Sequence, residues 1–151
     1  MAAARTELIK SLESLESIHQ FQIVFYNDKT SVFNPHRPRP PQLMFGTDEN
    51  KALAAAFVRN VIPAGATRHL APLRQALAMQ PDVIFFLTDA AEPQLTPDEL
   101  YGIQSRNRAG TVINTIEFGS GPFQGGDNFL VKLARQNGGK HVYVDVTRLS
   151  R

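Results

Sequence analysis

Two residues with side-chain oxygens, Thr67 and Asp89, have positions typical of ligand-binding groups. Thr67 ends the loop Ala64-Gly65-Ala66-Thr67, and Asp89 follows the apolar run Val83–Leu87 and Thr88. A run this apolar is typical of a strand at the doubly covered centre of a parallel sheet, and open α/β folds place ligand-binding groups at the carboxyl ends of such strands. We therefore expect Thr67 and Asp89 to share one site.

Ordinary structural roles are open to the same residues. Thr67 could cap a helix or hold a loop, and Asp89 could accept hydrogen bonds from loop amides beyond its strand. His69 is either a titratable group facing the same cleft or an exposed histidine at the start of a helix, and the sequence favours the second interpretation.

The glycine-rich segment Gly119–Gly126 is a second candidate, because it connects a predicted strand to a predicted helix, where phosphate-binding loops occur. With Asp89 it would serve a small α/β enzyme or a nucleotide-binding module. However, Gln124 breaks the dinucleotide fingerprint, and the segment lacks the Gly-Lys-Ser/Thr ending of a nucleotide P-loop. A flexible connection is the simpler interpretation.

The residue patterns of other catalytic and metal sites do not occur in this chain. The sequence shows no Ser-His-Asp order, nucleophile elbow or carboxylate pair that would support hydrolysis, so we assign no catalytic residue. The absence of cysteine excludes thiolate chemistry and disulfides, and His19, His36 and His141 lack the spacing of zinc ligands. The sequence therefore favours a protein that is not an enzyme.

Length and charge restrict the class of protein further. The 151 residues suit one domain spanning 1–151, and 16 basic against 14 acidic residues leave a net charge of +2. This charge implies no strong field for nucleic acid or a membrane surface. No apolar run has the length of a signal peptide or membrane span, so we expect the chain, as it stands, to be soluble and cytoplasmic.

The hydrophobic pattern predicts alternating helices and strands. Helices are expected over residues 5–19, after Thr47 or Asp48, along the stripe Leu70, Leu73 and Leu77, from the capping box at Thr96 towards Arg106, and over Asp127–Gln136. Strands are expected over Phe21–Tyr26, Ser31–Asn34, residues 82–88, Thr111–Phe118 and His141–Asp145, the second being an antiparallel edge strand. This order predicts an α/β fold with three αβα layers and a mostly parallel, doubly wound sheet of about five strands.

The order of these local patterns resembles that of a von Willebrand factor A domain, especially its divergent bacterial versions. The resemblance rests on the strand Phe21–Tyr26 with Asn27-Asp28, the Thr67 loop, the strand ending at Asp89, Asn114-Thr115-Ile116 with Phe118-Gly119, and Gln136-Asn137-Gly138-Gly139. Together these segments cover nearly the whole chain.

The resemblance implies a metal-ion-dependent adhesion site. In the family, an Asp-x-Ser-x-Ser motif, a threonine and an aspartate hold Mg²⁺, and a carboxylate from a protein partner completes the shell. Thr67 and Asp89 match the threonine and the aspartate. The chain begins inside what would be the first helix, so the first strand and the Asp-x-Ser-x-Ser motif are absent from it, and Ala90 replaces the usual glycine. We therefore expect an incomplete site that binds Mg²⁺ weakly, with no other cofactor.

The resemblance also implies a non-enzymatic domain that binds a protein partner, with an acidic residue of that partner as its contact. Without the first strand, we expect Phe21–Tyr26 to pair directly with Val83–Leu87 in a closed monomer. The alternative is a dimer in which a strand of a second molecule fills the gap.

Overall fold

The computed structural model describes residues 2–26, 30–61, 68–89 and 93–149. By internal contacts the chain divides into two compact units, Met1–Ala66 and Thr67–Arg151. None of the described helices is long and apolar enough to cross a membrane. We describe each unit by itself.

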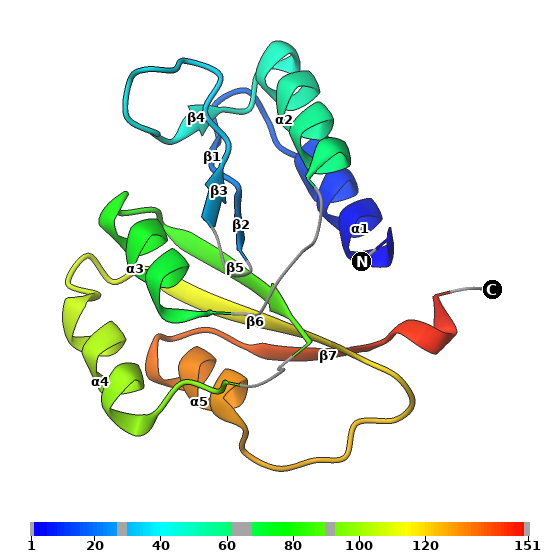
Figure 1. The fold of residues 1–151 in the computed structure, drawn as a ribbon, viewed down its shortest axis with the longest axis vertical. Helices are drawn as coiled ribbons and strands as arrows, with labels where there is room; N and C mark the ends of the chain where they lie inside the picture. The colour runs from blue at the N-terminus through cyan, green and yellow to red at the C-terminus, as the bar shows by residue number, and fades with distance from the viewer. Residues whose placement is uncertain (1, 27–29, 62–67, 90–92, 150–151) are drawn as a thin grey trace. The chain divides into compact units, whose positions relative to one another are not determined.

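The first unit combines two helices with two short antiparallel strand pairs (Figure 1). Its elements are α1 (Ala2–Glu13), β1 (Gln20–Phe21), β2 (Val24–Tyr26), β3 (Thr30–Val32), β4 (Met44–Phe45) and α2 (Asp48–Asn60). Strand β1 pairs with β4 and β2 pairs with β3, while α1 packs against α2. The core of this unit consists of Leu12, Phe21, Ile23, Phe33, Ala54 and Val58.

The first helix is shorter than predicted. It ends at Glu13 rather than near His19, and Ile18, expected on its apolar stripe, is 74% exposed. The chain turns here because Gly46 approaches it closely: the Gly46 amide donates to the His19 carbonyl over 2.7 Å, and a Cβ on Gly46 would meet the Glu16 carbonyl. Pairing of β1 with β4 therefore overrides the helical pattern.

The strand predicted over Phe21–Tyr26 is divided in two, β1 and β2, and each half has a different partner. The antiparallel hairpin predicted with the next segment is confirmed, because Phe25 of β2 lies opposite Ser31 of β3. The predicted start of the second helix is confirmed as well. Thr47 is its N-cap, and the Thr47 hydroxyl accepts a hydrogen bond from the Asn50 amide.

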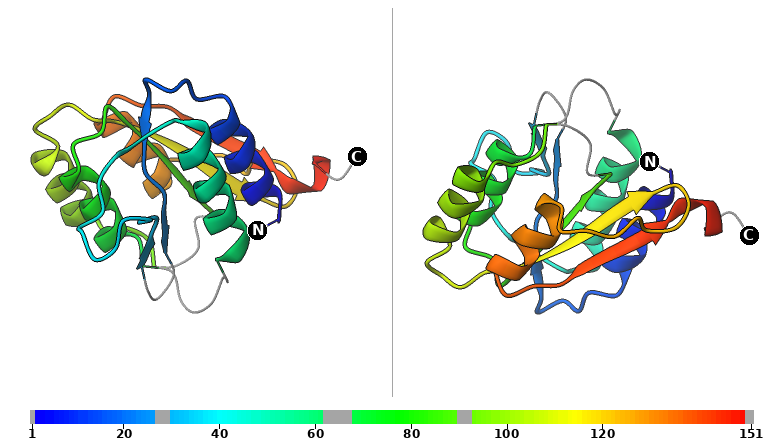
Figure 2. Two further views of the ribbon diagram at one scale, coloured as in Figure 1. Left: turned by 90° about the horizontal axis from the view of Figure 1, so that it is seen from above. Right: turned by 90° about the horizontal axis from the view of Figure 1, so that it is seen from below.

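The second unit is a three-stranded parallel sheet in the order β5-β6-β7, with helices connecting its strands. Its elements are α3 (Leu70–Ala78), β5 (Val83–Thr88), α4 (Pro97–Arg106), β6 (Val112–Gly119), α5 (Phe129–Gln136), β7 (His141–Asp145) and the 3₁₀ helix η1 (Val146–Arg148). Helix α4 contacts both α3 and α5, and α5 packs on β6 and β7, in front of which it lies in the right-hand view of Figure 2.

Local signals position these helices as the sequence predicts. Thr96 and Glu99 form the predicted capping box at the start of α4. Helix α5 begins at Phe129, two residues later than expected, because the side chain of Asn128 accepts hydrogen bonds from two amides of its first turn. Gly138, with a φ of 69°, ends α5 in the left-handed conformation that favours glycine.

The prediction that β5 is doubly covered is not confirmed within the second unit. Phe86 is 5% exposed, but Val83 and Phe85 on the opposite face are 42% and 65% exposed. Successive residues of a strand point to opposite faces, so an apolar run does not by itself show that both faces are covered. The prediction of one sheet of about five strands is not confirmed either, nor is the direct pairing of Phe21–Tyr26 with Val83–Leu87. The described strands form three separate sheets, and β2 pairs with β3 alone.

Side-chain amides join the ends of α4 and α5 to the start of β6. Asn107 accepts from the Thr111 amide over 2.8 Å and donates to the Thr111 carbonyl and to Asn137 Oδ1. Asn137, 7% exposed, donates in turn to the Leu133 carbonyl over 2.8 Å. The Thr111 hydroxyl donates to the Pro81 carbonyl over 2.6 Å, which ties this turn to the start of β5. The turn is therefore held at both ends by buried or half-buried hydrogen bonds.

Candidate functional site

The parallel register brings three strand ends to one edge of the sheet. Thr88 lies opposite Glu117, and Gly119 lies opposite Asp145, so Asp89 and the segment after Gly119 begin at the same edge. We call this the carboxyl edge. It is the edge at which open parallel sheets place their ligands.

The predicted metal-site residues are only partly described. Asp89 is exposed directly after β5, as the sequence predicts. Thr67, the loop Ala64–Thr67 and Asn27 lie outside the described residues, so the shared site of Thr67 and Asp89 stays a prediction. Among the residues that the structure describes, no three side chains of His, Asp or Glu lie together as a metal site would need.

The glycine-rich segment at this edge is fastened to β7 by two side chains. The Tyr143 hydroxyl donates to the Gly121 carbonyl over 2.9 Å, and the Gly121 amide donates to Asp145 Oδ1 over 3.0 Å. The Phe123 ring lies against the Tyr143 ring, with 5.1 Å between centroids. Gly119 has room for this arrangement only as glycine, since a Cβ there would lie 2.9 Å from the Tyr143 ring. The segment is therefore held against β7 rather than open, and we call Gly119–Gly126 the latched loop.

Hydrogen bonds lower the pKa of Asp145 below its ordinary value. The largest cause is the Thr147 hydroxyl, which donates to Asp145 Oδ1 over 2.6 Å. Desolvation, the second-largest cause, raises the pKa, whereas the Thr147 and Gly121 amides and the charge of Arg148 lower it further. Donors to a carboxylate stabilise its charged form, so Asp145 holds the loop as an anion at neutral pH.

A second polar group lies beneath the same loop. His141 Nε2 lies 2.8 Å from Glu117 Oε2, and Asn128 donates to the same oxygen over 2.9 Å. Both side chains of the His–Glu pair are nearly buried, at 13% and 12% exposure, and the Phe123 ring lies 5.5 Å from the His141 ring. The pair joins β6, β7 and the cap of α5, which indicates a structural role.

This geometry argues against phosphate binding by the loop. A phosphate loop offers free backbone amides to an anion. Here the Gly121 amide already donates to the carboxylate of Asp145, which has the charge that a phosphate would bring. An incoming phosphate would have to displace Asp145 and would be repelled by it.

His69 is not the exposed histidine that the sequence favours. It is 2% exposed, and its ring lies 4.9 Å from that of Phe129 and 5.7 Å from that of Phe86. It is the N-cap residue of α3, without a side-chain capping bond. One of these rings comes from β5 and the other from α5, and no local pattern near residue 69 predicts contacts with residues so far along the chain.

Sequence reasoning also missed Tyr143 and Asp145 as the residues that hold the loop. Both lie on β7 and meet the loop only through the register of β6 and β7. The available signal was alternation. Residues 141, 143 and 145 share one face because they alternate along the strand, and all three are polar or aromatic.

Comparisons with known proteins agree on the fold. No protein-family model matches the chain, and neither does any curated protein sequence. Among solved structures, a von Willebrand factor type A protein from Catenulispora acidiphila matches with a TM-score of 0.77 and 19% identity over 95% of this chain. Proximal thread matrix protein 1 from the mussel byssus matches with a TM-score of 0.62 and 18% identity over 97% of the chain.

These neighbours are longer proteins, of which this chain spans about a third, 34% and 37% respectively. The similarity covers 95% and 97% of this chain, respectively. The sequence identities are too low to transfer a function, but the match in structure is extensive. The chain therefore has a divergent von Willebrand factor A-like fold.

Proposed function

We propose that this chain is a non-enzymatic protein-interaction domain that binds its partner at the carboxyl edge of the β5–β7 sheet. The observation that carries the proposal is the von Willebrand factor A-like fold over 95% of the chain. Another structure of the mussel protein is described as having a zinc-occupied MIDAS motif, the metal-ion-dependent adhesion site. Asp89 directly follows β5 at the carboxyl edge of the sheet, and it is the described residue on which we base the proposed site.

The proposed site is an incomplete adhesion site centred on Asp89, with Thr67 as the second oxygen ligand. Mg²⁺ prefers six oxygen ligands and keeps several waters, so two protein oxygens would hold it weakly. An acidic side chain of the partner would supply a further oxygen. Metal and partner should therefore bind together better than either binds alone.

The test is an NMR titration of the ¹⁵N-labelled chain with Mg²⁺, with an acidic peptide, and with both. We expect the chemical shift change at Asp89 with both ligands present to exceed the sum of the changes caused by each ligand alone. Asp89→Asn should remove them, whereas Asp98→Asn, on the first turn of α4, should not. Shifts that are unchanged in Asp89→Asn would contradict the site.

The rival function, nucleotide binding by the Gly119–Gly126 loop, is tested in the same experiment. ATP added without peptide should leave the Gly121 and Phe123 amides unshifted, because Asp145 occupies the Gly121 amide. Saturable shifts of those amides would favour the nucleotide-binding module over the interaction domain.

We also propose that residues 1–151 form one domain that is a monomer in solution. The support for one domain is that each similar solved chain matches 95% or more of this chain, across both units. One domain should unfold in one transition, with the same midpoint by fluorescence and by circular dichroism. Two separated transitions, or a mass by light scattering that doubles with concentration, would contradict the proposal.

A further inference from the structure

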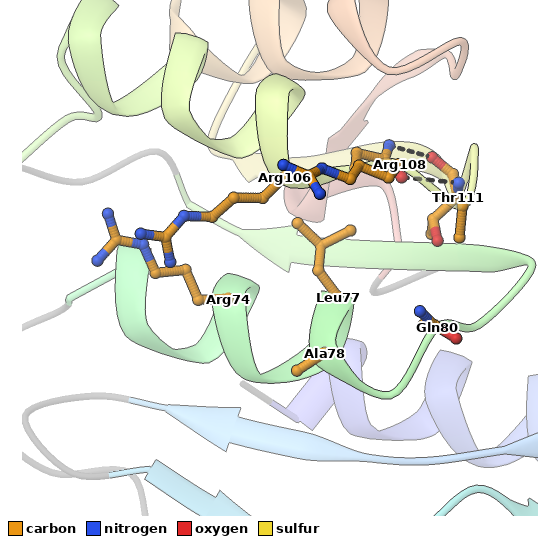
Figure 3. A pocket seen from close by; sticks show the side chains of 9 residues that line it. Arg74, Leu77, Ala78, Gln80, Arg106, Arg108 and Thr111 are labelled. Carbon is orange, nitrogen blue, oxygen red and sulfur yellow. Dashed lines mark hydrogen bonds between the residues drawn. The ribbon is translucent and has the colours of Figure 1, made fainter.

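A cavity of about 240 Å³ lies at the opposite, amino edge of the sheet, where β5 and β6 begin. It is formed by the second half of α3, the end of α4 and the turn before β6 (Figure 3). Three of the residues that line it are arginines, Arg74, Arg106 and Arg108. In Figure 3 the side chains of Arg74 and Arg106 extend towards each other from two different helices.

No carboxylate balances these three charges within the described part of the chain. The ion pairs found there join other cations, namely Lys10 with Glu7, Arg135 with Asp127 and Arg148 with Asp145. None of the residues lining the cavity is acidic. Guanidinium groups that converge without a counter-charge repel one another, and an anion between them would remove that repulsion.

Helix dipoles account for only one of the three arginines. Arg106 lies in the last turn of α4, where a cation is favoured by the negative helix end. Arg74 is not in the last turn of α3, and Arg108 lies beyond the end of α4. Their position at the cavity therefore needs another explanation.

The turn that presents Arg108 is rigid. Asn107 binds both the amide and the carbonyl of Thr111, and the Thr111 hydroxyl binds the Pro81 carbonyl. Figure 3 shows two of these bonds beside the cavity. A charge on a fixed backbone loses less conformational freedom on binding, so the turn that carries Arg108 is preorganised for a ligand of opposite charge.

We propose that this cavity is a binding site for a phosphate monoester group. The arginine fork pairs with phosphate oxygens through two parallel hydrogen bonds, and three cations match a dianion better than a singly charged carboxylate. The volume is below the range of roughly 300–1,000 Å³ typical of whole small-molecule ligands. The site thus takes the phosphoryl group and leaves the rest of the ligand outside, whether that is a phosphorylated side chain of a protein or a small phosphate ester.

The test follows the arginine Nε–Hε signals of the full chain by NMR at low ionic strength. The probes are inorganic phosphate, glycerol 3-phosphate, a phosphoserine peptide and its unphosphorylated form, with acetate as the monoanion. Each of three variants removes one guanidinium group from the cavity: Arg74→Gln, Arg106→Gln and Arg108→Gln. Arg59→Gln is the matched control, because Arg59 is also exposed in the last turn of a helix, α2, but lies outside the cavity.

We expect saturable shifts of the three arginines with phosphate, and affinity lower by about tenfold or more in each of the three variants but not in Arg59→Gln. Tighter binding of the peptide than of glycerol 3-phosphate would identify a phosphoprotein as the source, and the reverse a small ester. The absence of saturable shifts, equal binding of acetate, or equal loss in Arg59→Gln would overturn the proposal. If one variant fails to fold, the other two decide, since all three side chains are exposed. Neither result depends on Asp89, so the proposed protein-binding function is tested separately.

Discussion

The two edges of the β5–β7 sheet differ in whether their charged side chains have partners within the molecule. At the carboxyl edge the anion Asp145 is satisfied inside the molecule, by the Gly121 amide and by Thr147. At the amino edge the cavity arginines have no acidic partner within the described residues, although hydrogen bonds from Asn107 hold the turn that carries Arg108. A charge satisfied internally serves the fold, whereas cations held on a rigid base without a counter-charge are suited to an external ligand.

The edges also differ in which atoms an added side chain would meet. Of the changes considered, Gly139→Ala should cause the largest loss of stability. A Cβ on Gly139 would meet the backbone carbonyl of Ile113 in β6, which cannot move without breaking the ladder. We expect a loss of about 3 kcal/mol or more of unfolding free energy, measured by urea denaturation. The control is Gly102→Ala in α4, where nothing lies within 4 Å and the better helix former should stabilise slightly. A small loss at Gly139 would show that the amino edge is compliant.

Asn107→Ala should destabilise the turn before β6, which lines the arginine cavity. It removes the hydrogen bonds to Thr111 and Asn137, so we expect a loss of about 2 kcal/mol of unfolding free energy and weaker phosphate binding. The exposed Asn60 at the end of α2 provides the control Asn60→Ala, which should change neither. Unaltered phosphate affinity in a folded Asn107→Ala chain would show that the turn does not preorganise the site.

Gly119→Ala should disturb the carboxyl edge less than Gly139→Ala disturbs the amino edge. The clash is with the Tyr143 side chain, which can rotate away if it gives up its bond to the Gly121 carbonyl. We expect a loss of about 1 kcal/mol and faster amide exchange in the latched loop. Equal losses for the two glycines would remove the contrast between the edges.

Acid should open the latched loop through Asp145. Its pKa is lower in the folded chain than in the unfolded chain, so its stabilising effect is complete above the ordinary carboxyl range near pH 4. That effect is lost as the pH falls through the lowered pKa. Thr147→Ala removes the largest cause and should raise the pKa towards the ordinary value, as measured by ¹³C titration of the Asp145 carboxyl. An unchanged titration curve would contradict the assignment of the Thr147 hydroxyl as the largest cause of the lowered pKa.

Millimolar Mg²⁺ alone should have the smallest effect, a rise in melting temperature of little or nothing. A ligand stabilises in proportion to the logarithm of its concentration over its dissociation constant, and an incomplete oxygen shell binds Mg²⁺ weakly. A clear, saturable rise that Asp89→Ala abolishes would show a more complete metal site.

What the sequence predicts well is local. The capping box at Thr96, the Thr47 cap and the strand His141–Asp145 depend on neighbouring residues, and the structure confirms each of them. The division of Phe21–Tyr26 into two strands depends on pairing with Met44–Phe45, more than twenty residues away. No local pattern contains that register, because the free energy comes from distant partners.

The sites follow the same rule. Asp89 could be singled out because an aspartate after an apolar strand is a local signal. The arginine cavity could not, since Arg74 and Arg106 come from two helices that only the packing of α3 on α4 brings together. The burial of His69 between Phe86 and Phe129 escaped prediction for the same reason.

Asn137, one member of the Asn107–Asn137 amide pair, is also a site at which the protein would deamidate on storage. Asn137 precedes Gly138, and an asparagine followed by glycine is the sequence in which loss of the side-chain amide meets least steric hindrance. Conversion to aspartate would replace the donor to the Leu133 carbonyl with a second acceptor and place a negative charge at a nearly buried position. The end of α5 would then be less stable in an old sample, and a mass increase of about one dalton would accompany the change.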